Sequence, residues 1–219
     1  MNTISKVVEK LVVSSPFLEE ALTEKLINVS SLARKIKHQV EDEMGMEIKE
    51  GAIVMAINRL SPNYYYKVNI GIKDFVNQIG DIIVRSNLSS YTFVNSNSLT
   101  HQHVKLLQEI TEQKNIFYSF SQGVYETTIV VSEALNTKLE ELFTAEKMIS
   151  NKRTLSSITV KLPMENTEVS GLYYFIFKKL AWVGINIVEV ISTTNEFTVI
   201  VKEDDVDTAF SILKNLKKS

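Results

Sequence analysis

Two histidines and several neighbouring carboxylates are the side chains of this sequence best suited to metal binding or acid–base chemistry. His101 and His103 lie two positions apart, and such residues point to different sides of a helix, so we expect both at the surface. Adjacent carboxylates at 140–141 and 204–205 read as solvated helix ends, because paired acid–base work needs convergence in a cleft. No serine lies in a nucleophile elbow, and cysteine is absent. The sequence therefore predicts no catalytic site, no metal site, no cofactor and no enzyme activity.

The segment 170–187 offers recognition chemistry instead, because a glycine stands at each end of a helical pattern. A helix that opens at Gly171 exposes unpaired N–H groups and a partial positive charge, so the backbone of Val169, Ser170 and Gly171 suits a carboxylate. Taken singly, these residues have ordinary structural uses: Ser170 as a helix cap and Asn186 as a turn residue. Both interpretations remain open at this point.

The elements around this segment follow from its hydrophobic spacing. Apolar residues three or four positions apart predict a helix over 171–183, with one stripe facing a core. Gly184 is suited to a left-handed cap, and the β-branched residues after it predict a strand directly behind the helix. The stripe consists of Leu172, Phe175, Ile176, Leu180 and Val183.

Composition limits the classes of protein that this chain can be. The 219 residues are 44% hydrophobic and 23% charged, with a net charge of −2, which is ordinary for a globular protein. No apolar run reaches the length of a membrane span, and residues 1–15 do not resemble a secretion signal. The lack of cysteine is compatible with a reducing compartment, so a cytoplasmic protein without membrane partners is expected.

The first third of the chain reads as entirely helical, and we assign it to a region over 1–63. Helices are predicted over 5–13, 16–26, 31–44 and 51–60. The last two approach a helix-turn-helix, which would place Arg34, Asn58 and Arg59 as candidate nucleic-acid contacts. Residues 1–66 carry eight basic against nine acidic side chains, so charge does not favour DNA, and a packing or dimerisation bundle is preferred.

A repeat follows a poorly patterned connector at 64–80. Both copies, assigned to domains at 81–150 and 151–219, read as strand, helix, strand, strand, helix. In the first copy the strands are expected at 81–94, 116–122 and 125–131, and the helices at 98–114 and 133–143. In the second copy the strands are expected at 157–162, 187–193 and 197–202, and the helices at 171–183 and 205–216.

This element order predicts an α+β fold made of two ferredoxin-like units. Each unit has an antiparallel sheet with two helices on one face, since every helix has one apolar stripe to bury. A fourth strand is missing from each copy. Residues 154–162 would serve the first copy, and an exchange of strands between the copies would supply both.

The second copy resembles an ACT domain, and in particular the paired ACT domains at the regulatory end of aspartokinases. The resemblance rests on Ser170-Gly171 before the first helix, 177–181 within it, 184–187 at its exit, 197–201 in a strand and 205–209 at the second helix. The first copy matches in element order only, with Asn95-Ser96-Asn97-Ser98 in place of the glycine corner. No kinase domain is present, since about 60 helical residues without a phosphate-binding glycine loop precede the repeat.

This resemblance implies a ligand site and a partner. ACT domains bind an amino acid or similar effector at an interface between two domains, and they often form a homodimer through their sheets. The residues implied as ligand-binding are Thr167, Glu168, Val169, Ser170, Gly171, Asn186 and Ile187. We therefore expect a non-catalytic regulatory protein that senses a small metabolite. The alternatives are a ligand-free structural or dimerisation module and a ligand-responsive DNA-binding transcriptional regulator.

Overall fold

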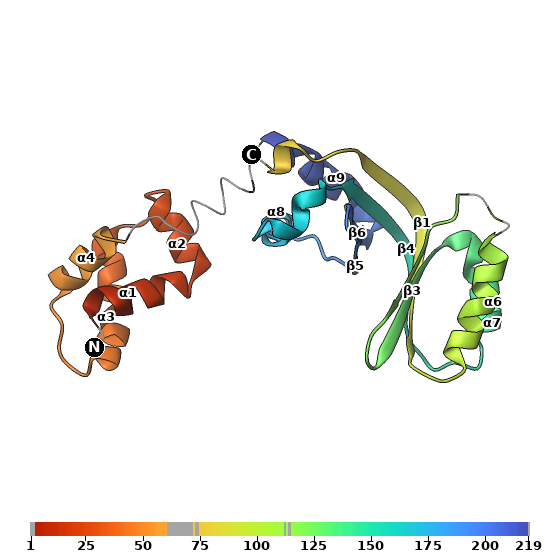
Figure 1. Ribbon diagram of the computed structural model, residues 1–219, viewed down its shortest axis with the longest axis horizontal. Helices are drawn as coiled ribbons and strands as arrows, with labels where there is room; N and C mark the ends of the chain where they lie inside the picture. The colour runs from red at the N-terminus through yellow and green to blue at the C-terminus, as the bar shows by residue number, and fades with distance from the viewer. Residues whose placement is uncertain (1–2, 61–71, 73–74, 112, 114, 219) are drawn as a thin grey trace. The chain divides into compact units, whose positions relative to one another are not determined.

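The computed structural model describes residues 3–60, 72, 75–111, 113 and 115–218, without the side chains of 16, 165, 167, 217 and 218 (Figure 1). The chain divides into two compact units, Met1–Ile72 and Lys73–Ser219, which are treated separately below. Most of the connector predicted at 64–80 lies outside the described residues. Within the described part of the chain, none of the helices has both the length and the apolar character that crossing a membrane requires.

The first unit is helical, as its sequence predicts. Its helices are α1 (Ile4–Val13), α2 (Pro16–Thr23), α3 (Val29–Met44) and α4 (Glu50–Asn58). The Asn28 side chain accepts a hydrogen bond from Ser31 N at 3.0 Å and caps α3, and Gly45 ends α3 in the left-handed conformation at φ 66°. The core between α1, α3 and α4 includes the fully buried side chains of Val8, Val40 and Ile53.

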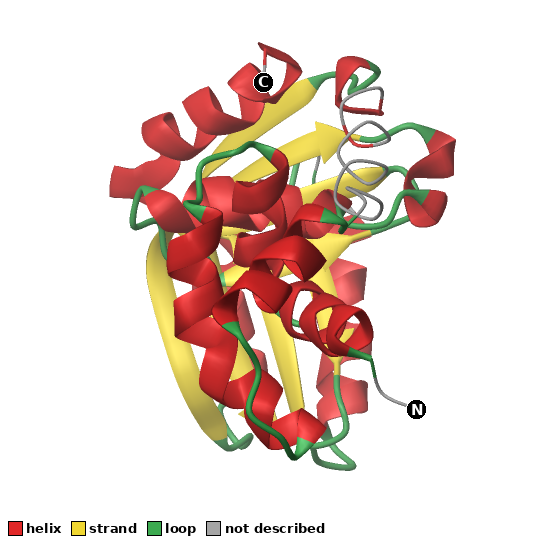
Figure 2. Ribbon diagram, turned by 90° about the vertical axis from the view of Figure 1, so that its left-hand side faces the viewer, coloured by secondary structure: helices red, strands yellow, loops and turns green. Residues whose placement is uncertain are grey.

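The second unit is built on one antiparallel sheet with the strand order β2-β3-β1-β4-β6-β5. Its strands are β1 (Ile82–Val94), β2 (Tyr118–Gln122), β3 (Glu126–Ser132), β4 (Met148–Lys161), β5 (Glu189–Ser192) and β6 (Glu196–Lys202). Its helices are α6 (Leu99–Thr111), α7 (Asn136–Leu142), α8 (Leu172–Trp182) and α9 (Val206–Lys214), with the 3-10 turns η1 (Glu133–Leu135), η2 (Met164–Glu168), η3 (Glu203–Asp205) and η4 (Asn215–Lys218). Figure 2 distinguishes these strands and helices by colour.

The expected strand exchange is present, and β1 and β4 carry it. In the first copy the order β2-β3-β1-β4 is a complete ferredoxin-like sheet, and in the second copy β5-β6-β4-β1 is another. Residues 82–85 of β1 pair with 157–160 of β4 and so give the second copy its fourth strand. The fourth strand of the first copy is the beginning of β4, at 148–152, and not 154–162 as expected. The strand predicted at 157–162 therefore starts at Met148.

Each long strand is interrupted where it passes from one copy to the other. Asn87 and Thr154 adopt left-handed conformations at φ 59° and 55°, and the β1–β4 register shifts beside them. Leu88 and Leu155 follow these residues and pair with each other across the sheet. The sequence carries the same repeat, Leu-Ser-Ser-x-Thr, at 88–92 and at 155–159.

The two faces of the sheet bury different cores. Ile129 and Val131 of β3 pack with buried leucines of α6 and α7. Successive side chains of a strand alternate between faces, so Val130 points to the opposite face. There it forms a second cluster with Leu88, Leu155 and Ile200, which joins the two copies.

Candidate functional site

The loop before α8 is held in place by a buried asparagine. Asn166 is 4% exposed, and its amide nitrogen donates to the carbonyl oxygen of Pro163 at 2.9 Å and to that of Thr194 in the β5–β6 turn. The Asn166 carbonyl accepts the N–H of Val169 at 3.3 Å. These bonds anchor the loop to the neighbouring hairpin. Asn166 was not among the residues expected from the sequence, although asparagine is a common turn residue.

The start of α8 exposes backbone donors. Gly171 occupies the N-cap position in a left-handed conformation at φ 84°, and its carbonyl accepts the N–H of Phe175 at 2.9 Å. The suggested capping role of Ser170 is wrong, because Gly171 is the N-cap residue, none of the described side chains caps this helix, and Ser170 is exposed. The first turn also lacks an acidic residue. Uncapped N–H groups at a helix start form a site of the kind that binds carboxylate or phosphate.

The neighbours of Gly171 in this loop differ in exposure. Glu168 is exposed and Val169 is half-buried, whereas the side chain of Thr167 lies outside the described part of the chain. The Tyr173 hydroxyl lies 2.9 Å from the Ser192 hydroxyl, which connects the first turn of α8 to the end of β5. The structure therefore places the predicted residues 168–171 together on one anchored loop.

The equivalent loop of the first copy is closed. Ser96 accepts the N–H of Leu99 at 3.1 Å, which caps α6, and the same hydroxyl donates to Glu146 at 2.6 Å. The Asn95 amide donates to the carbonyl oxygen of Gly123 at 2.8 Å. In this copy the Ser96 hydroxyl therefore occupies one backbone donor at the helix start, Leu99 N.

The other two predicted ligand residues lie at the far end of α8. The helix has 11 residues, which corresponds to about 16 Å of length. Gly184, at φ 77°, follows that helix and precedes Asn186, which is exposed, and Ile187, which is half-buried. Within one chain, a small ligand on the loop at 168–171 does not reach Asn186.

The candidate nucleic-acid contacts lie in the helical unit. Arg34 is committed to neighbours: its guanidinium bonds Glu50 at 3.2 Å and Ser31 at 3.2 Å. Asn58 ends α4, and Arg59 follows it, both exposed. A role of these residues in DNA binding stays a prediction, and the ion pair of Arg34 does not favour it.

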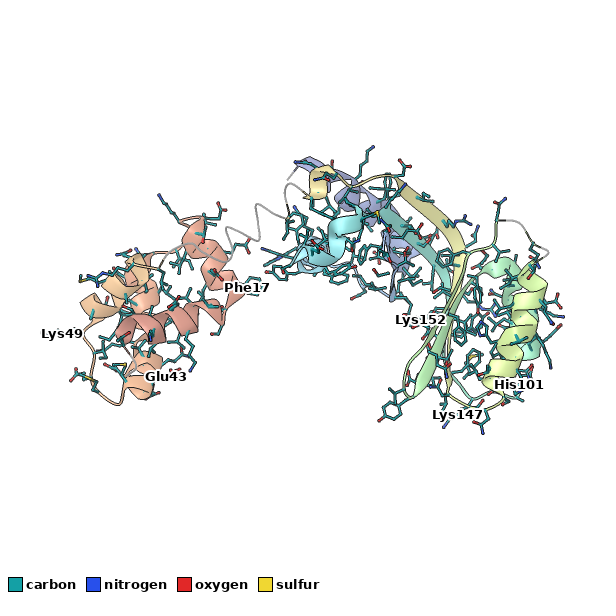
Figure 3. The ribbon with its side chains drawn as sticks, in the orientation of Figure 1. Phe17, Glu43, Lys49, His101, Lys147 and Lys152 are labelled. Carbon is teal, nitrogen blue, oxygen red and sulfur yellow. The ribbon has the colours of Figure 1, made fainter. Side chains whose placement is uncertain are left out.

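One of the two histidines is packed rather than exposed. His101 is exposed and its Nδ1 lies 3.3 Å from the Asn97 carbonyl oxygen (Figure 3). His103 was expected at the surface, which is wrong: its ring is half-buried and stacks on Phe120 with 3.7 Å between ring centres. Its Nε2 contacts the hydroxyl of Tyr118. Across the described residues, no group of three or more histidine or acidic side chains is arranged to hold a metal ion.

We predict that the packing of His103 makes the sheet unit sensitive to acid. Burial lowers the pKa of His103 in the folded chain, so below the unfolded value of about 6.5 the unfolded chain binds a proton that the folded chain resists. Stability is therefore complete above about pH 6.5 and falls as the pH drops towards the folded pKa. Urea unfolding between about pH 8 and 5 measures this loss.

His103→Gln tests the assignment, with His101→Gln as its matched control. The loss near pH 6 should shrink in His103→Gln, because the titrating ring is gone, and it should persist in the exposed His101→Gln. An identical pH profile for wild type and His103→Gln would contradict the prediction.

The comparison with solved structures identifies the fold of the second unit. The ligand-free regulatory subunit of aspartate kinase from Thermus thermophilus superposes with a TM-score of 0.52 at 11% identity, over 63% of this chain and 97% of that one. A structure of aspartokinase alpha and beta subunits matches with a TM-score of 0.51 at 15% identity, over 64% of this chain and 99% of that one. No protein-family model matches the sequence, and neither does any curated protein.

A third match is to part of a longer enzyme. Aspartate kinase from Clostridium acetobutylicum superposes with a TM-score of 0.52 at 19% identity, and the 63% of this chain that is aligned covers 34% of that enzyme. At such identities the likeness is one of fold. The second unit thus has the fold of paired ACT regulatory domains, as its sequence predicted, with a helical unit before it.

Proposed function

We propose that this chain is a non-catalytic regulatory protein whose ACT-like unit binds an amino acid or a related small metabolite. The uncapped start of α8 at Gly171 carries the proposal, because it presents backbone donors on a loop that Asn166 anchors. Gly171 has no side chain to block the approach of a carboxylate. Its counterpart loop in the first copy is closed by Ser96, so the proposal places one effector site in each chain.

The length of α8, which separates the loop at 168–171 from Asn186, has a consequence for the oligomeric state. A small ligand touches both the loop at 168–171 and Asn186 only where the loop of one chain meets the strand start of another. Among the described strands, β2 and β5 form the two edges of the sheet, and sheet edges are ready sites for pairing. We therefore include a homodimer, formed through the sheets, in the proposal. The cysteine-free composition agrees with a cytoplasmic setting.

A thermal-shift screen of the standard amino acids tests the effector site. A ligand present at 100 times its Kd stabilises the folded state by about 2.7 kcal/mol, so a saturable rise in Tm of several degrees is expected for at least one of them. Gly171→Trp should reduce this rise, because its side chain would fill the approach to the helix start.

Gly45→Trp is the matched control. Gly45 also has a positive φ, at 66°, and nothing lies within 4 Å of an added Cβ there, but it belongs to the helical unit. It should keep the ligand response. A response of undiminished size in Gly171→Trp would show that the site is elsewhere. A dimer that resists dilution, with no response to any amino acid, would favour the structural pairing module instead.

A further inference from the structure

A pocket of about 310 Å³ lies where the two copies exchange strands. It is bounded by residues 152–155 of β4, by Val188 and by residues 202–204 after β6. Thr154, at φ 55°, interrupts β4 inside this boundary, and Figure 3 shows Lys152 near the middle of the unit. Its boundary includes none of the residues of the loop before α8, so it is separate from the effector site proposed above.

Some charges of the pocket are already paired. Arg153 bonds Glu140 of α7, outside the pocket, and Glu203 accepts a hydrogen bond from the Ser156 hydroxyl. Lys202 and Asp204 form no ion pair with any described residue, and both are exposed. The wall therefore presents both signs of charge to a ligand.

Lys152 adds a second cation on the same wall. Its charged neighbour is Glu189 of β5, a carboxyl whose pKa is raised by burial and only partly lowered by this lysine. No described carboxylate forms an ion pair with Lys152, which is exposed, so its ammonium group remains able to bind an anion. Leu155, 2% exposed, and Val188 give the pocket an apolar surface between the charges.

The first copy provides an internal comparison, because each of its two matching positions is hydrogen-bonded to another residue of that copy. Arg85 corresponds to Lys152, and its guanidinium donates to the Asn115 carbonyl oxygen at 3.0 Å. Ser132 corresponds to Lys202, and its hydroxyl accepts the N–H of Phe117 at 2.9 Å. In the second copy the matching residues are Lys152 and Lys202, and both line the pocket.

We propose that this pocket is a second binding site and that it takes a small zwitterion of the amino-acid class. The carboxylate lies between the ammonium groups of Lys152 and Lys202, the ligand's ammonium faces Asp204, and its apolar part rests on Leu155 and Val188. The pocket volume matches the lower end of small-molecule sites. A ligand there contacts β4 on both sides of Thr154, and so it links the two copies.

Backbone amide NMR of the full chain tests the site, with each standard amino acid added separately at millimolar concentration. We expect saturable shifts at the amides of Lys152, Thr154, Val188 and Lys202 for at least one amino acid. Lys202→Ala should weaken this binding about tenfold, because one charge-assisted hydrogen bond is lost. Lys147→Ala, an exposed lysine of the same unit outside the pocket, should leave the affinity unchanged.

Two further variants separate this site from the loop site. Val188→Phe should abolish the shifts by filling the pocket, whereas Gly171→Trp should leave them intact, so failure of one site does not imply failure of the other. Acetate carries only the carboxylate and methylammonium only the ammonium group, so each should bind more weakly than the amino acid. The proposal is overturned if no amino acid shifts these amides, if acetate binds equally well, or if Lys202→Ala binds normally.

Discussion

Leu155→Ala is expected to lower the free energy of unfolding of the sheet unit by about 2–5 kcal/mol, the range for truncating a buried leucine. Leu155 is 2% exposed and packs with Leu88, Val130 and Ile200 in the cluster that joins the two copies. The substitution leaves a cavity where β1 and β4 pass from one copy to the other. Urea unfolding followed by circular dichroism measures the loss.

The shared strands also predict how the unit unfolds in this variant. Because β1 and β4 belong to both copies, neither copy keeps a complete sheet when the other opens, and a single transition is expected. Ile149→Ala on the same strand is the matched control, since Ile149 is 48% exposed and should cost no more than about 0.5 kcal/mol. Two separate transitions for the two copies, or equal losses in both variants, would contradict this account.

Ile53→Ala is expected to destabilise the helical unit by a similar amount, about 2–5 kcal/mol. Ile53 of α4 is fully buried in the core that α1, α3 and α4 share. A bundle of about 60 residues has little stability to spare, so the loss should unfold a large fraction of it. Amide hydrogen exchange should become fast in α1, α3 and α4 and stay slow in the sheet.

Met55→Ala on the same helix is the control, because Met55 is 55% exposed and its loss leaves no cavity. The expected contrast depends on the division of the chain at Ile72. An equal rise of exchange in the helices and in the sheet after Ile53→Ala would show that the two units unfold together.

Secondary structure was readable because local signals agree with the final packing. The stripe predicted for α8 is confirmed at Leu172, Ile176 and Leu180, which are buried, whereas Phe175 is half-buried and Val183 is exposed. Positive-φ glycines at 171 and 184 bound that helix where the sequence placed its corners. Helix spacing and glycine conformations act within a few residues, so they can be read without knowing the fold.

The first half of β4 was missed for a physical reason. Residues 150–154 are polar and mostly exposed, so they lack the alternating apolar pattern of a half-buried strand, and their pairing with β1 is what makes them extended. The repeat Leu-Ser-Ser-x-Thr at 88–92 and 155–159 was the available signal. Aligning the two copies on it would have shown where each strand changes copy.

In the candidate site, too, local features were predicted from the sequence and long-range contacts were not. The loop at 168–171 was identified from its glycine, but the buried anchor Asn166 depends on the Thr194 carbonyl, which lies 28 positions away in the chain. The same limit applies to His103, whose expected exposure was wrong because Phe120 lies over its ring. Spacing on a helix tells which side a residue is on, and it does not tell what packs against that side.

The sequence by itself determined three features: a helical region followed by a sheet-forming region, the duplicated βαββα order, and the segment at 170–187 with a glycine near each end of its helix. Each of them depends on short-range preferences. The tertiary structure alone decided which strands are shared, that Asn186 lies a helix length from Gly171, and that Lys152 and Lys202 meet at one pocket. Those outcomes depend on contacts between residues far apart in the chain, where many arrangements satisfy the same local pattern and only complete packing selects one.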